Sequence, residues 1–308
     1  MPMLECISLA TLQRATPPSK ALICLGNFDG VHYAHRQLIR LAAATRARDF
    51  KDAALTVFCF RTPSTDDLFP QQAPMHLSTL EQKLDYFREE GVEYVFLADF
   101  PKIRDLSKED FVQTILKEEC HCVCAVCGFN YRFGKMGAGT ATELSYLLDA
   151  PVMIQDEICL HGDTVSSTRI RRLLANGNVK EAADLLTRPY GFHSTVVHGK
   201  SLGHTWKIPT INQNMPRELL VPKLGVYVTE CEINGNKVRG VSNVGLRPTV
   251  DQNASVNCET FLLDFSGNLY GKDITVCFLD YLRPEQKFET TKQLREQIAR
   301  DIEAAKNY

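Results

Sequence analysis

The stretch that decides the fold is GNFDGVHYAH, residues 26–35. It follows a short apolar run at residues 21–25, which is long enough for one buried strand. After it, residues 35–50 have apolar side chains on one side of a helical pattern, namely Leu38, Ile39, Leu41 and Ala42. The sequence therefore predicts a strand, a glycine-bounded turn and a helix in succession.

The turn and the helix start together predict an anion site. Free backbone N–H groups at a helix N-terminus bind phosphate, and His32 and His35 lie close enough on one helical face to donate to the same anion. We interpret the segment as a nucleotide site that includes Gly26, Asn27, Phe28, Asp29 and Gly30. Two simpler interpretations remain. The histidines could cap a helix, or they could begin a zinc site, although no third ligand follows at a useful spacing.

Length and composition indicate the class of protein. A chain of 308 residues is expected to form two domains, and 44% hydrophobic with 23% charged residues is typical of a globular protein. The net charge of −2 does not favour nucleic-acid binding. No apolar stretch is long enough to cross a bilayer, and the first residues do not resemble a secretion signal. We expect a cytoplasmic protein with neither nucleic acid nor membrane as a partner.

Several of the 11 cysteines gather around His121, namely Cys120, Cys122, Cys124 and Cys127. A metal cluster is one interpretation. We favour a buried strand in which cysteine is a small hydrophobic residue. In a regular strand Cys120, Cys122 and Cys124 would share one face, which is a poor geometry for tetrahedral zinc.

The first half of the chain alternates strand-like and helix-like segments. Apolar runs predict strands and helical spacing predicts helices, in the order 53–60, 78–90, 92–97, 108–119 and 122–127. Gly91 is expected to end the helix at 78–90. Such alternation predicts a parallel sheet covered by helices, whose ligands bind at the carboxyl ends of the strands.

The second half has a different pattern. A helical pair follows Ser166, Ser167 and Thr168, whose hydroxyls are good N-caps. Short strand-like runs then recur at 193–198, 225–233, 237–244, 255–265 and 273–279, and an amphipathic helix follows at 291–306. Short, evenly spaced strands predict a small β-barrel or sandwich. The expected domains are residues 1–187 and 188–308.

With this layout the chain resembles the prokaryotic bifunctional riboflavin kinases/FAD synthetases over essentially its whole length. Seven segments match in order: residues 26–35, 128–139, 166–171, 209–212, 243–249, 259–265 and 269–272. The resemblance implies an α/β nucleotidyltransferase domain with a Rossmann-like parallel sheet. It also implies a small antiparallel β-barrel riboflavin kinase domain with a C-terminal helix. Riboflavin, FMN and ATP would be the substrates, and Mg²⁺ would be the cofactor.

For the first domain, the resemblance implies transfer of AMP from ATP to FMN. The FMN phosphate is already ionised, so this site needs alignment and donors rather than a base. His32, His35 and Arg169 would be those donors, and Ser166, Ser167 and Thr168 would bind nucleotide. Asn130 and Phe133 would hold the flavin. The simpler interpretations are a solvated helix charge for Arg169 and an ordinary glycine-rich turn around Asn130.

For the second domain, the resemblance implies phosphorylation of riboflavin. A neutral alcohol is the nucleophile, so a carboxylate beside it is useful, and Glu259 would be that base. The oxygens of Thr210 and Asn212 would hold Mg²⁺ and nucleotide. Gly199 and Gly203 would let the backbone approach phosphates closely. The simpler interpretations are a solubilising glutamate and a plain turn.

The chain departs from the family pattern in both halves. Ala34 stands where the pattern has glycine, and no histidine occurs near Thr62. His204, Trp206 and Lys207 replace an arginine, an aliphatic residue and a glycine. Three alternatives therefore stay open. They are an FMN adenylyltransferase whose barrel binds flavin with little kinase activity, a flavin- or nucleotide-sensing protein, and a nucleotidyltransferase for another phosphate ester.

Overall fold

The computed structural model describes residues 7–11, 18–61, 75–199, 210–247 and 255–308. Its contacts divide the chain into two units, Met1–Pro74 with Ser78–Ser166 and Met75–Leu77 with Ser167–Tyr308. Helices α7 (Ser167–Asn176) and α8 (Val179–Leu186) are thereby grouped with the second unit. The expected boundary at residue 187 stays a prediction.

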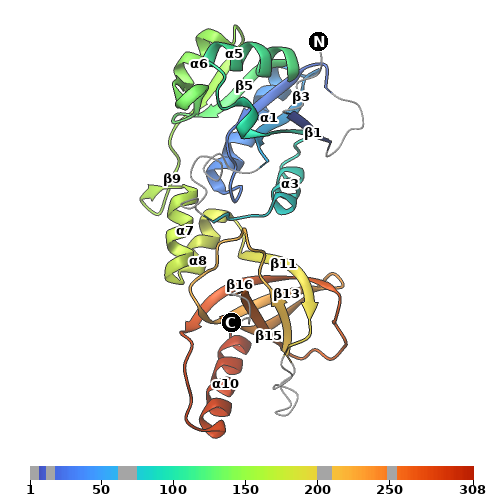
Figure 1. Cartoon of the computed structure of the whole chain (residues 1–308), viewed down its shortest axis with the longest axis vertical. Helices are drawn as coiled ribbons and strands as arrows, with labels where there is room; N and C mark the ends of the chain where they lie inside the picture. Colours follow the sequence, from blue (N-terminus) through green and yellow to red (C-terminus); the bar gives the residue numbers. More distant parts are fainter. Residues whose placement is uncertain (1–6, 12–17, 62–74, 200–209, 248–254) are drawn as a thin grey trace. The chain divides into compact units, whose positions relative to one another are not determined.

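The first unit contains the parallel α/β sheet that the sequence predicts (Figure 1). Within the described residues the sheet has six strands in the order β1-β4-β3-β2-β5-β8. Their bounds are β1 Ile7–Thr11, β2 Ala21–Leu25, β3 Ala54–Phe60, β4 Tyr94–Ala98, β5 Cys122–Gly128 and β8 Val152–Gln155. All neighbours are parallel except β1 and β4. The chain moves outward from β2 in both directions, so the crevice for a ligand is expected at the carboxyl ends of β2 and β5.

Two apolar clusters cover the two faces of this sheet. One packs α1 (Tyr33–Asp49) and α3 (Leu80–Glu89) through residues such as Ile39 and Phe87. The other packs α6 (Ala141–Leu147) and the π-helix η1 (Phe111–Glu119) through residues such as Leu144 and Ile115. The remaining short elements are α4 Phe100–Ile103, α5 Lys108–Asp110, β6 Arg132–Phe133, η2 Lys135–Gly137, β7 Gly139–Thr140, β9 Cys159–Leu160 and β10 Asp163–Thr164.

Most predicted bounds in this unit agree with the structure to within a few residues. α1 begins at Tyr33 rather than at His35, and Leu41, one of its apolar residues, is 36% exposed. α3 ends at Glu89, and Gly91 follows in a left-handed conformation with φ +79°. This is the expected C-terminal glycine.

The cysteine strand shows one wrong expectation. Cys122 packs on one face of the sheet and Cys124 on the other, so alternate cysteines do not share a face. The cause is an irregular register: Ala21 pairs with Cys122, but Leu22 pairs with Cys124. The extra residue is a β-bulge, which reverses the side-chain alternation at that point. Both thiols are buried, and burial raises their pKa, for Cys122 to about 12.

The second unit contains a closed antiparallel barrel in the order β11-β12-β15-β14-β13-β16. Its strands are β11 Tyr190–Val197, β12 Thr210–Asn214, β13 Gly225–Ile233, β14 Asn236–Arg247, β15 Ser255–Leu262 and β16 Asp273–Arg283. Inside the barrel, the buried hydroxyls of Thr229, Ser242 and Thr260 form a chain with two 2.7 Å hydrogen bonds. Because these polar side chains satisfy one another, they can replace part of an apolar core.

The C-terminal helix α10 (Thr291–Lys306) packs on the barrel through Ile302 and Ala305. A charged contact adds to this packing. The guanidinium of Arg283, at the end of β16, donates to both oxygens of Asp301 at 2.7–3.1 Å, and the Asp301 side chain is 5% exposed. Gln297 donates to the same carboxylate at 2.9 Å. Among the described residues, no helix has both the length and the apolar character needed to cross a bilayer.

We expect Asp301→Ala to lower the free energy of unfolding of the barrel unit by about 3 kcal/mol, because it leaves a largely buried guanidinium unpaired. Urea unfolding followed by circular dichroism measures the loss. Glu296→Ala is the matched control on the same helix, since its exposed contact with Lys292 should contribute less than about 1 kcal/mol. Equal losses in the two variants would contradict the proposed importance of the buried pair.

Candidate functional site

The turn after β2 has an unusual backbone. Phe28, Gly30 and Val31 all have positive φ, at 52°, 77° and 38°. Positive φ costs glycine little, but it strains phenylalanine and a β-branched valine. Both of these side chains are fully buried, and Ser78 accepts a hydrogen bond from the Gly30 amide at 3.3 Å. Packing therefore holds the strained turn in place, as is common at functional sites.

The two histidines lie directly against each other at the start of α1. His32 is the N-cap, and its Nδ1 accepts from the backbone N–H of His35 at 3.4 Å. The imidazole rings stack at 3.6 Å between centroids with 14° between their planes. Phe28 lies against His35 at 5.0 Å. The helix start thus presents two imidazoles side by side, which confirms the expected proximity of the pair.

The environment of His35 keeps its ring neutral. Burial is the main cause that lowers the pKa of His35 well below the ordinary 6.5, and the neighbouring His32 and Lys83 lower it further. The buried Nδ1 of His35 has no hydrogen-bond partner among the described residues. A bound anion would favour the protonated ring, because negative charge nearby raises a histidine pKa.

Sequence reasoning did not single out Lys83, which contacts the turn at Asn27 but does not line the cavity described below. Lys83 is 3% exposed, and its Nζ donates to the carbonyl oxygen of Asn27 at 3.2 Å. No carboxylate of the described residues pairs with this ammonium. One signal was available: Lys83 stands at helical spacing from Leu80 and Phe87, on the apolar side of α3. A buried ammonium without a carboxylate is costly unless an anion approaches it.

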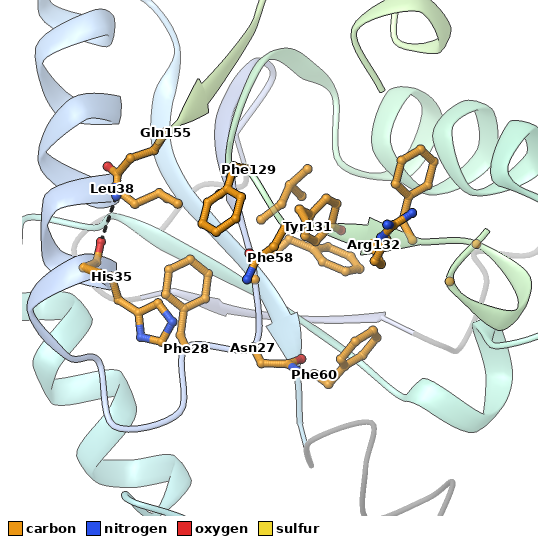
Figure 2. Close-up of a pocket in the computed structure, with 18 of the residues that line it drawn as sticks. Asn27, Phe28, His35, Leu38, Phe58, Phe60, Phe129, Tyr131, Arg132 and Gln155 are labelled. Atoms are coloured by element: carbon orange, nitrogen blue, oxygen red, sulfur yellow. Dashed lines mark hydrogen bonds between the residues drawn. The ribbon is translucent and has the colours of Figure 1, made fainter. Parts of the chain in front are cut away.

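A cavity of about 630 Å³ opens beside the histidines (Figure 2). It lies where β2 and β5 end, since Leu25, Gly26 and Gly128 line it, as the strand order predicts. Much of the remaining wall is aromatic, including Phe28, Phe58, Phe60, Phe129 and Tyr131. Figure 2 also shows Gln155, which donates to the carbonyl of Ala34 at 3.2 Å. The apolar wall of the cavity therefore suits a flat aromatic ligand. The start of α1 beside it suits an anion.

Seven of the predicted site residues line this cavity: Gly26, Asn27, Phe28, His32, His35, Asn130 and Phe133. Asp29 and Gly30 are buried and do not line it. The Asn130 side chain is exposed, whereas Phe133 is buried. A Cβ on Gly139 would come within 2.7 Å of the Phe133 ring. The glycine in this loop is therefore needed where the aromatic ring packs.

The predicted nucleotide-binding residues around the start of α7 fall on both sides of the boundary between the two units. Ser166 is the last residue of the first unit, and Ser167, Thr168 and Arg169 begin α7 in the second. Arg169 is 7% exposed, and its guanidinium donates to Glu181 of α8 at 2.8 Å. The solvated helix charge considered for Arg169 is therefore not what the structure shows. A role for these residues toward nucleotide stays a prediction.

The barrel brings together the predicted residues of the second site. Asn212 on β12 is the cross-strand partner of Glu259 on β15, and Thr210 is the partner of Phe261. Because side chains alternate along a strand, Thr210 and Asn212 lie on the same face as Glu259. The Glu259 side chain is exposed, while Asn212 is 6% exposed.

Gly199 lies close to this polar face. A Cβ at Gly199 would come within 2.3 Å of the Asn212 amide, so this position has no room for a side chain. The expected approach of Gly199 to phosphates stays a prediction. Gly203 lies outside the described residues, as do Thr62, His204, Trp206 and Lys207. Among the described residues, no group of three or more His, Cys, Asp or Glu could hold a metal ion.

The fold and the two candidate sites together define a class of protein. A parallel α/β unit has stacked histidines beside an aromatic cavity, and a closed barrel has a carboxylate among amide and hydroxyl oxygens. The chain is therefore of a class that joins an α/β unit with a ligand-sized cavity to a small antiparallel barrel.

Comparison with known proteins identifies the family. The family model described as FAD synthetase matches residues 15–169, and the one described as riboflavin kinase matches residues 186–308. The bifunctional riboflavin kinase/FMN adenylyltransferase of Listeria monocytogenes is 32% identical, with 91% of this chain and 90% of that protein covered. The protein of the same description from Escherichia coli K12 is 33% identical, with 95% and 94% covered. The chain belongs to the bifunctional riboflavin kinase/FMN adenylyltransferase family.

One solved structure shares the fold along nearly the whole chain. It is a protein from Streptococcus pneumoniae described as a macrolide-efflux protein, with 32% identity, a TM-score of 0.88 and 97% of each chain covered. Its description differs from that of the curated relatives. The two family models and those relatives agree with each other, so they determine the family.

We expect the His35 ring to titrate well below pH 6.5 in the folded protein. Since the unfolded chain then binds the extra proton, His35 reduces stability as the pH falls below about 6.5 toward its folded pKa. NMR titration of the ring protons measures this pKa. Lys83→Met should raise the pKa of His35 modestly, because it removes a nearby positive charge while burial remains. Lys20→Met, which breaks an exposed ion pair with Asp52, is the control and should leave the pKa of His35 unchanged. An ordinary pKa for His35 would disprove this description of the site.

Proposed function

We propose that this chain makes FAD from riboflavin in two steps, each at its own site. The barrel phosphorylates riboflavin with ATP to give FMN. The α/β unit transfers AMP from a second ATP to FMN and releases pyrophosphate. The observation that carries the proposal is the cavity of about 630 Å³ where an aromatic wall meets the stacked pair His32 and His35. Its volume is within the range of roughly 300–1,000 Å³ typical of small-molecule sites.

Adenylyl transfer requires alignment more than proton removal. The FMN phosphate has a second pKa of about 6, so it is largely dianionic at neutral pH. One of its oxygens bonds to the α-phosphorus of ATP, the bond from that phosphorus to the bridging oxygen breaks, and pyrophosphate leaves. His32 and His35 supply N–H donors where negative charge develops, and the turn amides add more. The buried ammonium of Lys83 adds positive charge close to His35. The aromatic wall accommodates the flavin ring, with Asn130 at its edge.

Riboflavin phosphorylation has a different chemical requirement. The ribityl hydroxyl is neutral, and Glu259 accepts its proton as the oxygen bonds to the γ-phosphorus and ADP leaves. The oxygens of Thr210 and Asn212 suit Mg²⁺, a hard cation that prefers oxygen ligands. When bound, this ion would neutralise phosphate charge. The buried, unpartnered Oδ1 of Asn257 beside Asn212 supports a ligand at this face, because such an atom needs a partner.

Product chromatography after incubation with ATP and magnesium tests both activities. His35→Ala should lower FAD formation from FMN at least ~100-fold, as expected when a transition-state donor is removed. The same variant should keep its rate of FMN formation from riboflavin. His193→Ala, an exposed histidine on β11, is the matched control and should change neither rate. A His35→Ala enzyme that still made FAD at the normal rate would exclude the proposed site.

Glu259→Ala should show the opposite effect. We expect FMN formation to fall ~100-fold, as for loss of a positioned base, while FAD formation from added FMN is unchanged. Glu232→Ala, an exposed glutamate on β13, is the matched control. If the native chain converts FMN to FAD but makes no FMN, the adenylyltransferase-only alternative is correct. If it binds flavin tightly and does neither, it is a binding protein.

A further inference from the structure

We propose that Asn257 is a positioning residue of the barrel site, which holds the carboxylate of Glu259 and the amide of Asn212 in a fixed arrangement. The inference rests on the proposed kinase activity of the barrel. Neither the sequence motifs nor the family resemblance singled out Asn257.

The geometry connects all three side chains through one amide group. The Nδ2 of Asn257 donates to Oδ1 of Asn212 at 3.1 Å and to Oε1 of Glu259 at 3.2 Å. Asn257 and Glu259 are two residues apart on β15, so their side chains leave the same face of the strand. Asn212 is the cross-strand partner of Glu259. One primary amide thus uses both of its N–H groups to fix the two acceptors.

The burial of Asn257 shows that this contact is more than a surface bond. Asn257 is 6% exposed, as is Asn212, whereas the Glu259 side chain is exposed. A flexible glutamate at an exposed position has many rotamers, and ordering it costs free energy. A buried donor that is itself held by Asn212 reduces that freedom. Pre-organisation of this kind determines how well a reactive group is aligned.

The other end of the amide points to an occupant of the site. The Oδ1 of Asn257 is buried and accepts no hydrogen bond from the described residues. Leaving a buried acceptor unpaired costs about 1–3 kcal/mol. A ligand hydroxyl or a water bound with the ligand would satisfy this oxygen. Asparagine has both the donors for Glu259 and Asn212 and an acceptor for the occupant.

A purely structural role for Asn257 is not supported by the packing. The neighbouring residues Cys258 and Thr260 face the barrel interior, where Thr260 belongs to the hydroxyl chain. Asn257 lies on the opposite face of β15, because side chains alternate along a strand. Its side-chain amide donates to the two candidate site residues. The interior therefore does not depend on its amide.

Two near-isosteric variants test the proposal. Asn257→Asp replaces the donor by a third acceptor, and Asn257→Leu removes polarity altogether. We expect both to lower kcat for FMN formation about 10- to 100-fold, as for loss of a partner that orients a ligand-contacting group. The KM for riboflavin should change less than about threefold, since an interaction that acts mainly in the transition state affects kcat. Asn236→Asp, at the exposed tip of the β13–β14 hairpin, is the matched control.

Three further readouts separate positioning from stability and from the proposed function itself. FAD formation from FMN by the same variants should be unchanged, and the thermal unfolding midpoint of the uncharged variant Asn257→Leu should stay close to that of the native chain. The proposal is wrong if kcat remains within twofold, if only the unfolding midpoint falls, or if both activities fall together. If the native chain makes no FMN at all, the kinase proposal fails, and that outcome is visible before any variant is compared.

Discussion

The candidate site for adenylyl transfer depends on the strained turn between β2 and α1. Phe28 and Val31 adopt positive φ only because both side chains are buried on the α1 and α3 side of the sheet. The ring of Phe28 makes an edge contact with Phe87 of α3, which fixes the turn on the core. The same ring also packs against the imidazole of His35. The same packing that stabilises the first unit therefore aims both imidazoles at the cavity. Because of this coupling, a substitution in the core that packs against the turn would move the imidazoles even though the substituted residue contacts no ligand.

The two candidate sites present different polar groups. In the first unit the neutral His35 lines the cavity and the buried Lys83 contacts the turn, and neither has a carboxylate partner among the described residues. In the second unit the polar face of the barrel offers oxygen atoms from Thr210, Asn212 and Glu259 instead. One site thus presents donors and the other acceptors. This matches the difference between an ionised phosphate nucleophile and a neutral alcohol.

Most of the fold could be predicted from the sequence, because long apolar runs and helical spacing were unambiguous at β2, β3, α3, β13 and α10. The edge strands β1 and β8 and the short helix α6 were missed, since each is brief or only partly buried. The motifs predicted the histidine pair and assigned Thr210, Asn212 and Glu259 to one site, but they did not predict that Asn212 and Glu259 are cross-strand partners. No motif includes Lys83 or Asn257. The helical spacing of Lys83 indicates its burial but not its contact with Asn27, and the contact of Asn257 with Asn212 depends on strand pairing. The bulge at Cys122 was equally hidden, since only the pairing with β2 reveals it.

The buried thiols have a consequence for the chemistry of the whole chain. Among the described cysteines, Cys159 is exposed, Cys277 is partly covered, and the other eight are buried. Burial raises the pKa of several of them, for example to about 11 at Cys124 and Cys258, so little reactive thiolate forms at neutral pH. Within the described part of a cysteine-rich protein, alkylating dyes and mild oxidants should therefore react first at the short β9 strand. A fluorescent reporter could be attached there without disturbing the sheet or the barrel.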